Sequence, residues 1–175
     1  MFSTTVRSGG VPLSSNCASL TGDFSPTVYL YDGKGLTANV IEEVGSSGNV
    51  LARYTQGTDV DEQLIEFRSG TNSNYQRDGL GSVTSLSTSA GALSSTYSYD
   101  SFGELTASTG TITNPFQYTG REFDSETGIY YYRARYYDQN AGRFLGEDPM
   151  RFEIGINFYP FVQDDPVGHI DPSGH

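Results

Sequence analysis

The sequence predicts an all-β fold built from antiparallel β-hairpins. Short β-branched and aromatic runs alternate with clusters of Gly, Asn, Asp and Ser, a pattern typical of strands joined by tight turns. No long window repeats apolar residues at the helical spacing i, i+3, i+4 and i+7. The 21 glycines among 175 residues favour turns and weaken helices. We therefore expect strands to dominate and helix to be limited to a turn or two.

Residues 1–27 are rich in Ser, Thr and Gly and contain no copy of the unit described below. We expect an irregular arm there, or a truncated strand that pairs with repeats further upstream. No apolar segment follows a positively charged start, so no signal peptide is visible. No apolar run approaches the roughly 20 residues of a membrane-spanning helix, and we expect no membrane insertion.

Residues 28–114 repeat one unit: an aromatic strand ending in Asp, a Gly turn, a second strand, a second Gly turn and a strand returning to Tyr. Copies begin at Tyr29–Asp32 and Tyr75–Asp78, and Asp100–Gly103 opens a third. The Asp side chain can accept hydrogen bonds from amides two residues on, and Gly supplies positive φ. A single hairpin is marginal, so neighbours must pair in a continuing sheet. Its open edges are expected to bind further repeats or copies of the chain itself.

Residues 115–175 carry a denser aromatic pattern. We expect Tyr130–Tyr137 to form one central, buried strand. A period of two places alternate residues on one face of such a strand: Tyr130, Tyr132, Ala134 and Tyr136. Arg133 and Arg135 fall on the other face, stacked on rings or paired with carboxylates. The candidate partners nearby in sequence are Glu122, Asp124 and Glu126.

Composition excludes several functions. The formal charge is −11 with a pI near 4.4, and no basic stripe exists, so nucleic acid is not an expected partner. The basic residues are nine arginines and Lys34, and most arginines are expected to be structural. Cys17 is the only cysteine, which rules out an intrachain disulfide. His and Cys lack metal-ligand spacing, so we expect no metal and no cofactor.

Two further features favour structural interpretations. Asp59, Asp61 and Glu62 form an acidic cluster without the spacing of a calcium loop, and we expect a solvated turn. His169 and His175 lie near carboxylates, but no motif places a Ser or Cys nucleophile beside them. No metabolic enzyme activity is expected.

The stretch from Tyr97 to Gly174 closely resembles the repeat-associated core domain of Rhs and YD-repeat proteins. Related to this group are the C component of bacterial Tc toxins and, distantly, the YD shell of teneurins. The residues that carry the resemblance are Tyr99–Gly103, Phe116–Glu122, Thr127–Asp138, Gly142–Phe144, Asp148–Pro149, Asp165–Val167 and Asp171–Gly174. Between Val28 and Tyr75 the resemblance is looser, and residues 1–27 carry none.

The resemblance implies a hollow shell made of a spiralling β-sheet, with the core domain (115–175) closing one end. In toxin-bearing members a C-terminal toxin begins just after the second Asp-Pro-x-Gly motif, so we expect the cargo to lie outside this chain. The expected function is an encapsulating structural module of an exported protein, extracellular or at the cell surface. A C-terminal toxin segment is an expected partner.

Two Asp-Pro pairs suggest the one candidate for chemistry. They lie at Asp148–Arg151 and Asp171–Gly174. In the family such motifs are associated with aspartyl self-cleavage, in which one carboxyl group keeps a proton and the other activates water. Arg151 stands where the family usually has Gly, and His175 where it has Leu. Arg151 and Arg143 are candidate partners of the carboxylates.

Other interpretations stay open. Asp-Pro-x-Gly also fits a type I turn, with Asp first, Pro second and Gly fourth. Roughly three repeats cannot close a shell, so open edges could instead assemble an extracellular filament-like subunit. A third alternative is an adhesive surface subunit that presents exposed Tyr and Asp to sugars.

Overall fold

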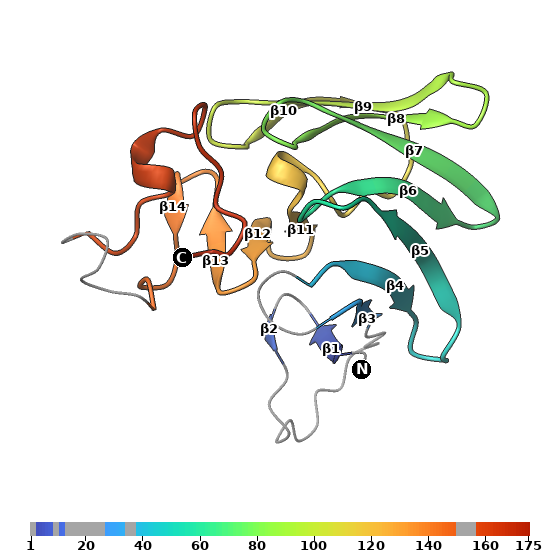
Figure 1. Cartoon of the computed structure of the whole chain (residues 1–175), viewed down its shortest axis with the longest axis horizontal. Helices are drawn as coiled ribbons and strands as arrows, with labels where there is room; N and C mark the ends of the chain where they lie inside the picture. The colour runs from blue at the N-terminus through green and yellow to red at the C-terminus, as the bar shows by residue number, and fades with distance from the viewer. Residues whose placement is uncertain (1–2, 9–10, 13–26, 34–37, 150–156) are drawn as a thin grey trace.

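The computed structural model describes residues 3–8, 11–12, 27–33, 38–149 and 157–175. Ten strands form one sheet (Figure 1): β1 (Ser3–Ser8), β2 (Val11–Pro12), β3 (Thr27–Tyr31), β4 (Val40–Val44), β5 (Val50–Gln56), β6 (Gln63–Arg68), β7 (Thr71–Arg77), β8 (Val83–Thr88), β9 (Leu93–Tyr99) and β10 (Leu105–Thr109). A second sheet contains β11 (Glu122–Asp124), β12 (Ile129–Tyr132), β13 (Arg135–Asp138) and β14 (Arg143–Phe144). Within these ranges, helix is limited to the 3-10 turns η1 (Tyr118–Gly120) and η3 (Val162–Asp164). The all-β prediction is confirmed.

In the large sheet, strands that are consecutive in the sequence from β3 to β10 are also neighbours in space. Its strand order is β10-β9-β8-β7-β6-β5-β4-β3-β1-β2, and every neighbouring pair is antiparallel. Sequential pairing of this kind is the expected result of hairpins that each need a neighbour. Figure 1 shows the sheet as an arc, with η1 and the second sheet in its mouth. Strands β1 and β2 fall within residues 1–27, and β1 pairs with β3.

The Asp-Gly turns work as predicted. The Asp78 carboxylate accepts hydrogen bonds from the N–H groups of Leu80 and Ser82, both at 2.9 Å. Asp100 accepts from Phe102 at 2.9 Å and from Glu104 at 2.8 Å. In both turns a glycine with positive φ follows three residues after the Asp, where an L side chain would be strained.

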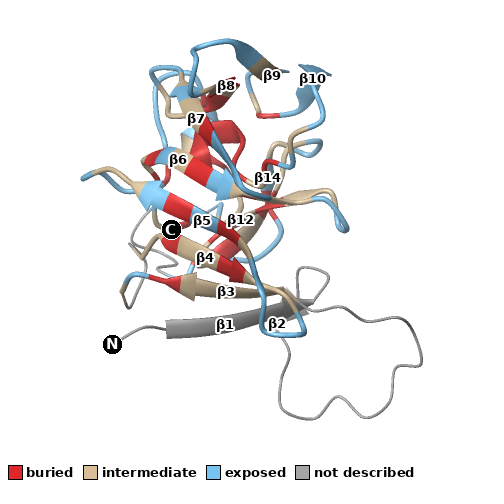
Figure 2. Cartoon of the chain, turned by 90° about the vertical axis from the view of Figure 1, so that its right-hand side faces the viewer, coloured by how far each residue is buried: buried red, intermediate tan, exposed pale blue. Residues whose placement is uncertain are grey.

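Two buried clusters share one interior. The first lies on the large sheet and includes Tyr54, Leu86 and Phe116. Phe116 belongs to the segment that enters the second sheet, and its ring packs edge-on against Tyr54 at 4.9 Å. The second cluster is aromatic and consists of Tyr118, Tyr130, Tyr132, Tyr137, Phe144 and Phe161. Figure 2 shows the buried residues along the middle strands, with exposure increasing at β9 and β10.

The expected single strand Tyr130–Tyr137 was wrong. The segment is a tight hairpin, in which Arg133 has a φ of 58° and reverses the chain between β12 and β13. Tyr130 pairs with Tyr137, so both rings face the aromatic cluster. A strict alternation of side chains cannot reveal a turn that contains no Gly, Pro, Asn or Asp.

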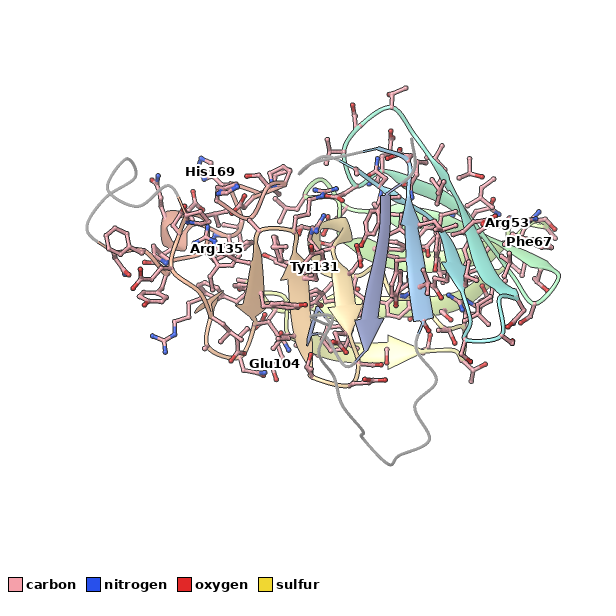
Figure 3. All side chains as sticks on the ribbon, turned by 90° about the horizontal axis from the view of Figure 1, so that it is seen from below. Arg53, Phe67, Glu104, Tyr131, Arg135 and His169 are labelled. Carbon is pink, nitrogen blue, oxygen red and sulfur yellow. The ribbon has the colours of Figure 1, made fainter. Side chains whose placement is uncertain are left out.

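The concave face of the large sheet buries charged side chains as well as rings. Tyr54 donates to Glu43 at 2.5 Å, and Arg68 pairs with Glu43 at 2.9 Å and with Glu66 at 2.6 Å. Burial raises the pKa of the Glu66 carboxyl group, and Arg68 opposes this. The other face is exposed, and Figure 3 shows Arg53 and Phe67 at the outer side of the sheet, far from Arg135.

The buried tyrosines predict alkaline unfolding. Burial raises the pKa of Tyr118 to about 12, and raises the pKa of Tyr130, Tyr132 and Tyr137 further. The unfolded chain loses these protons near pH 10, whereas the folded chain retains them, so stability falls as pH rises through this range. We expect ultraviolet titration to show these tyrosines ionising only as the protein unfolds. In denaturant all 13 tyrosines should titrate together; the same curve without denaturant would contradict the burial.

Candidate functional site

The C-terminal tail, residues 171–175, lies against the β12–β13 turn. Arg135 Nε donates to the carbonyl of Gly174 at 2.6 Å, and Arg133 donates to the carbonyl of Pro172. Gly174 has a φ of 76°, and a Cβ built on it would overlap the carbonyl oxygen of Tyr132. The site therefore depends on an arginine pair and on a glycine that permits close approach.

Arg135 brings the two predicted carboxylates together. Its Nη2 atom lies 3.1 Å from Asp148 Oδ2 and 3.6 Å from Asp171 Oδ2. All three side chains are at least nine-tenths buried. The guanidinium plane also stacks on Phe144, with its central carbon 3.6 Å from the ring centroid. Burial lowers the pKa of the Arg135 guanidinium, whereas Asp148 and Asp171 oppose that shift.

Asp171 uses its two oxygens differently. Oδ1 accepts from the N–H groups of Ser173, Gly174 and His175, at 3.2, 2.8 and 3.3 Å. Oδ2 faces Arg135. The type I turn interpretation and the carboxylate-pair interpretation are therefore compatible, because the turn amides hold one oxygen and leave the other directed at the site.

His175 completes the cluster. Its Nδ1 atom lies 3.9 Å from Asp148 Oδ1 and is buried without a hydrogen-bond partner. A cavity of about 380 Å³ opens beside these groups, lined in addition by Asn157, Phe158 and Ile170. The cavity is large enough for several water molecules beside the carboxylates.

The remaining predicted site residues lie elsewhere. Arg143 is exposed on β14, and the structure gives the role proposed for it to Arg135. Arg151 lies outside the described residues. Exposed His169 contacts Asp165 at 3.0 Å rather than the pair. Within the described ranges no cluster of three His, Cys, Asp or Glu side chains could hold a metal ion.

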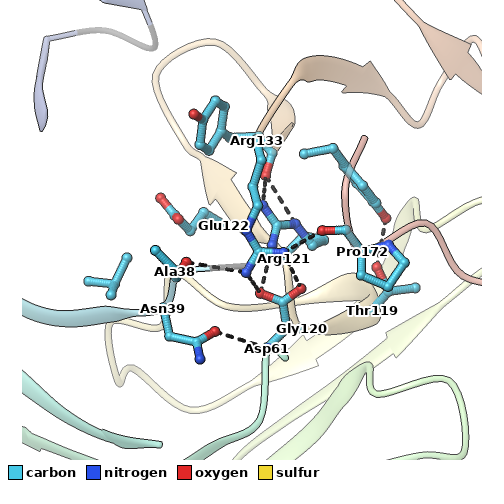
Figure 4. Close-up of polar contacts among 12 residues, drawn as sticks. Ala38, Asn39, Asp61, Thr119, Gly120, Arg121, Glu122, Arg133 and Pro172 are labelled. Atoms are coloured by element: carbon cyan, nitrogen blue, oxygen red, sulfur yellow. Dashed lines mark hydrogen bonds and ion pairs between the residues drawn. The ribbon is translucent and has the colours of Figure 1, made fainter. Parts of the chain in front are cut away.

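The environment expected for Asp61 was wrong. Asp61 was expected in a solvated turn, but it is 8% exposed and contacts two arginines (Figure 4): Arg121 at 2.6 Å and Arg133 at 2.7 Å. The partners expected for Arg133 and Arg135 were Glu122, Asp124 and Glu126. The pairs observed are instead with Asp61 for Arg133 and with Asp148 and Asp171 for Arg135. That both arginines would pair with carboxylates is confirmed.

Substitution of Gly174 should dislodge the tail. Gly174→Ala adds a Cβ that overlaps Tyr132, whereas Gly128→Ala, at a φ of 73°, meets no atom within 4 Å. Both changes force alanine into left-handed backbone, at about 1–2 kcal/mol. Only Gly174→Ala should also speed hydrogen exchange at residues 173–175. Equal exchange in the two variants would show that close packing of the tail is not needed.

The fold and the site together define a class: hairpins in a curved YD-type sheet, followed by an aromatic core whose tail is held by arginines. No family profile matches the sequence. The chain is 36% identical over 156 residues to the tRNA3(Ser)-specific nuclease WapA of Bacillus spizizenii, covering 85% of this chain and 7% of that protein. It is 27% identical to the double-stranded DNA deaminase toxin A of Burkholderia cenocepacia, over 75% of this chain and 9% of that protein.

Solved structures show the same fold. The TcdB2-TccC3-TEV crystal structure matches 98% of this chain with a TM-score of 0.68 at 20% identity, covering 8% of its own chain. The TcdB2-TccC3-Cdc42 structure matches 86% with a TM-score of 0.66 at 21% identity, covering 8% of its own chain. The chain belongs to the Rhs-type YD-repeat proteins, and its C-terminal part is a repeat-associated core domain. It spans less than a tenth of the length of these relatives and structures.

Proposed function

We propose that this chain is the C-terminal closing segment of an encapsulating β-shell, part of an exported protein that works outside the cell or at its surface. The observation that carries the proposal is the placement of the core. Phe116 packs against Tyr54 on the concave face, and the second sheet occupies the mouth of the arc (Figure 1). A segment that fills the mouth of a curved sheet is suited to closing a shell.

The shell partner is proposed to be further YD repeats. Strand order follows the chain, so repeats that precede this segment would extend the sheet beyond β1 and β2. At the opposite edge β9 is the one described strand that pairs with β10, and the five residues of β10 are all exposed. In the described part of the chain, no helix has the length and apolar character to span a membrane.

A segment swap tests the closing role. The matching region of Bacillus subtilis WapA, 36% identical over 156 residues, is replaced by residues of this chain. We expect the C-terminal segment of the swapped protein to resist protease as well as that of intact WapA. A second swap carrying Tyr132→Ala is the control and should lose protection. A C-terminal segment that is digested in the first swap, or in WapA itself, would contradict the proposal.

A second function is self-processing, and the geometry at Arg135 favours it. Asp148 and Asp171 contact the same guanidinium nitrogen. Hydrolysis by a carboxyl pair requires one group in the ionised form, as the base, and the other in the protonated form, as the acid. The ionised group accepts a proton from water, and the hydroxide attacks the peptide carbonyl. The protonated group donates to the departing amide nitrogen, which frees a carboxyl group and an amine. Arg135 sets the distance between the two groups.

A further inference from the structure

Asp61 lies where three parts of the chain meet (Figure 4): the large sheet β1–β10, from here on called the hairpin sheet, the second sheet β11–β14, called the core sheet, and the tail, residues 171–175. It belongs to the loop between β5 and β6. Its N–H donates to Asn39 Oδ1 at 3.1 Å, and its carbonyl accepts from Arg77 at 2.8 Å. The hairpin sheet thus holds the backbone of Asp61 and leaves its carboxylate directed at the core sheet.

Two buried arginines share this carboxylate. Arg121 Nη1 donates to Oδ1 at 2.6 Å, while Arg133 donates to Oδ1 at 2.7 Å and to Oδ2 at 3.0 Å. The Arg121 and Arg133 side chains are 2% and 7% exposed. Arg133 Nη1 also donates to the carbonyl of Pro172. Arg133 therefore links the hairpin sheet to the residue that follows Asp171.

The pair of arginines needs an anion between them. Burial and the positive charge of Arg121 lower the pKa of the Arg133 guanidinium, whereas Asp61 and, to a smaller extent, Glu122 oppose this shift. Asp61 is the carboxylate that accepts hydrogen bonds from Arg133, and a buried cation that loses such a partner is strongly disfavoured, so we expect Arg133 to leave this position without Asp61. The hydrogen bond from Arg133 to the carbonyl of Pro172 would then be lost.

The backbone at this junction is strained. Asp61 and Arg133 have φ values of 61° and 58°, and Thr119 beside them has 49°. Left-handed backbone in non-glycine residues persists only where surrounding contacts enforce it, and it gathers at functional sites. Here the enforcing contacts come from three separate segments, so the arrangement forms only when all three are docked.

We propose that Asp61 is a positioning residue that couples docking of the hairpin sheet to assembly of the Asp148–Asp171 pair. With the β5–β6 loop docked, Asp61 holds Arg133, Arg133 holds Pro172, and Asp171 is presented to Arg135. Without it, the tail loses one of its two arginine anchors. Processing is thereby restricted to chains whose sheet is complete. This consequence rests on the proposed self-processing, whereas the effect on the tail does not.

Hydrogen exchange of the 175-residue chain tests the effect on the tail. Asp61→Asn keeps the side-chain shape, tolerates left-handed backbone and removes the charge. Asp59→Asn is the matched control, since Asp59 lies exposed in the same loop. We expect the amides of residues 173–175 to exchange at least about tenfold faster in Asp61→Asn, a change of roughly 1.4 kcal/mol in tail opening. Asp59→Asn should match the parent, and β7–β8 amides should be unchanged in both.

A double-mutant cycle separates positioning from general stability. Arg133→Gln should raise the exchange rate of amides 173–175 by a factor similar to that of Asp61→Asn. The double variant should exchange less than about twofold faster than either single variant. Tail exchange at the parent rate in Asp61→Asn would overturn the proposal. So would an equal rise in Asp59→Asn, an equal rise across β7–β8, or fully additive effects.

A reporter protein fused after His175 tests the link to processing. If the parent fusion releases the reporter, Asp61→Asn should slow release at least about tenfold while Asp59→Asn does not. Release at the parent rate in Asp61→Asn would overturn the coupling. If the parent releases nothing, the self-processing proposal fails, and the exchange measurements alone decide whether Asp61 positions the tail.

Discussion

Tyr132→Ala should lower the free energy of unfolding by about 3–5 kcal/mol, the usual cost of deleting a large buried aromatic side chain. Tyr132 is fully buried, its ring lies edge-on to Tyr137, Phe144 and Phe161, and its hydroxyl group lies 2.7 Å from Thr119 Oγ1. The change removes these contacts and leaves a cavity. Thermal denaturation should show a fall in Tm on the order of 10 °C.

Tyr136→Ala is the matched control, because Tyr136 lies on the other face of the same hairpin and is half-buried. Its ring packs on Tyr131 at 5.3 Å, outside the aromatic cluster. The expected loss is smaller than for Tyr132→Ala. Equal losses in the two variants, or an unchanged Tm in Tyr132→Ala, would show that the aromatic cluster does not hold the core together.

The hairpin sheet could be predicted because its signals are local. The turns at Asp78 and Asp100 each carry an Asp that accepts hydrogen bonds from amides two and four residues on, and a Gly with positive φ three residues on. These determinants lie within one turn, so the sequence displays them directly. The β12–β13 hairpin gives no such signal, because Arg133 adopts left-handed backbone under contacts from Asp61 and Pro172.

The sequence identified the two carboxylates of the candidate site but not the arginine that pairs with them. The repeated Asp-Pro motif identifies Asp148 and Asp171 through a resemblance that covers the whole tail. Arg135 could not be assigned to them, because the ion pairs join residues 13 and 36 positions apart through tertiary packing. Asp61 was missed for the same reason: its arginines lie at sequence separations of 60 and 72. A charge pattern shows which side chains need partners but does not show which partners folding supplies.

Asp148→Asn and Asp171→Asn should each stop release of a reporter protein fused after His175. The amide is close in shape to the carboxyl group, and in Asp171→Asn the side-chain oxygen can still accept from the turn amides, so the fold should survive. The amide can neither accept a proton from water nor donate one as an acid. Loss of general acid–base catalysis slows such reactions by roughly 10²–10⁴-fold. Release is followed by electrophoresis and intact mass.

Asp165→Asn is the control for these two variants, since Asp165 also precedes a proline near the C-terminal end of the chain but pairs with His169 rather than with Arg135. It should release the reporter at the parent rate. Unchanged thermal denaturation in all three variants would show that any loss of release is chemical. Release that continues in either Asp148→Asn or Asp171→Asn removes the carboxylate pair as the source of cleavage and leaves both motifs as turns that anchor the tail.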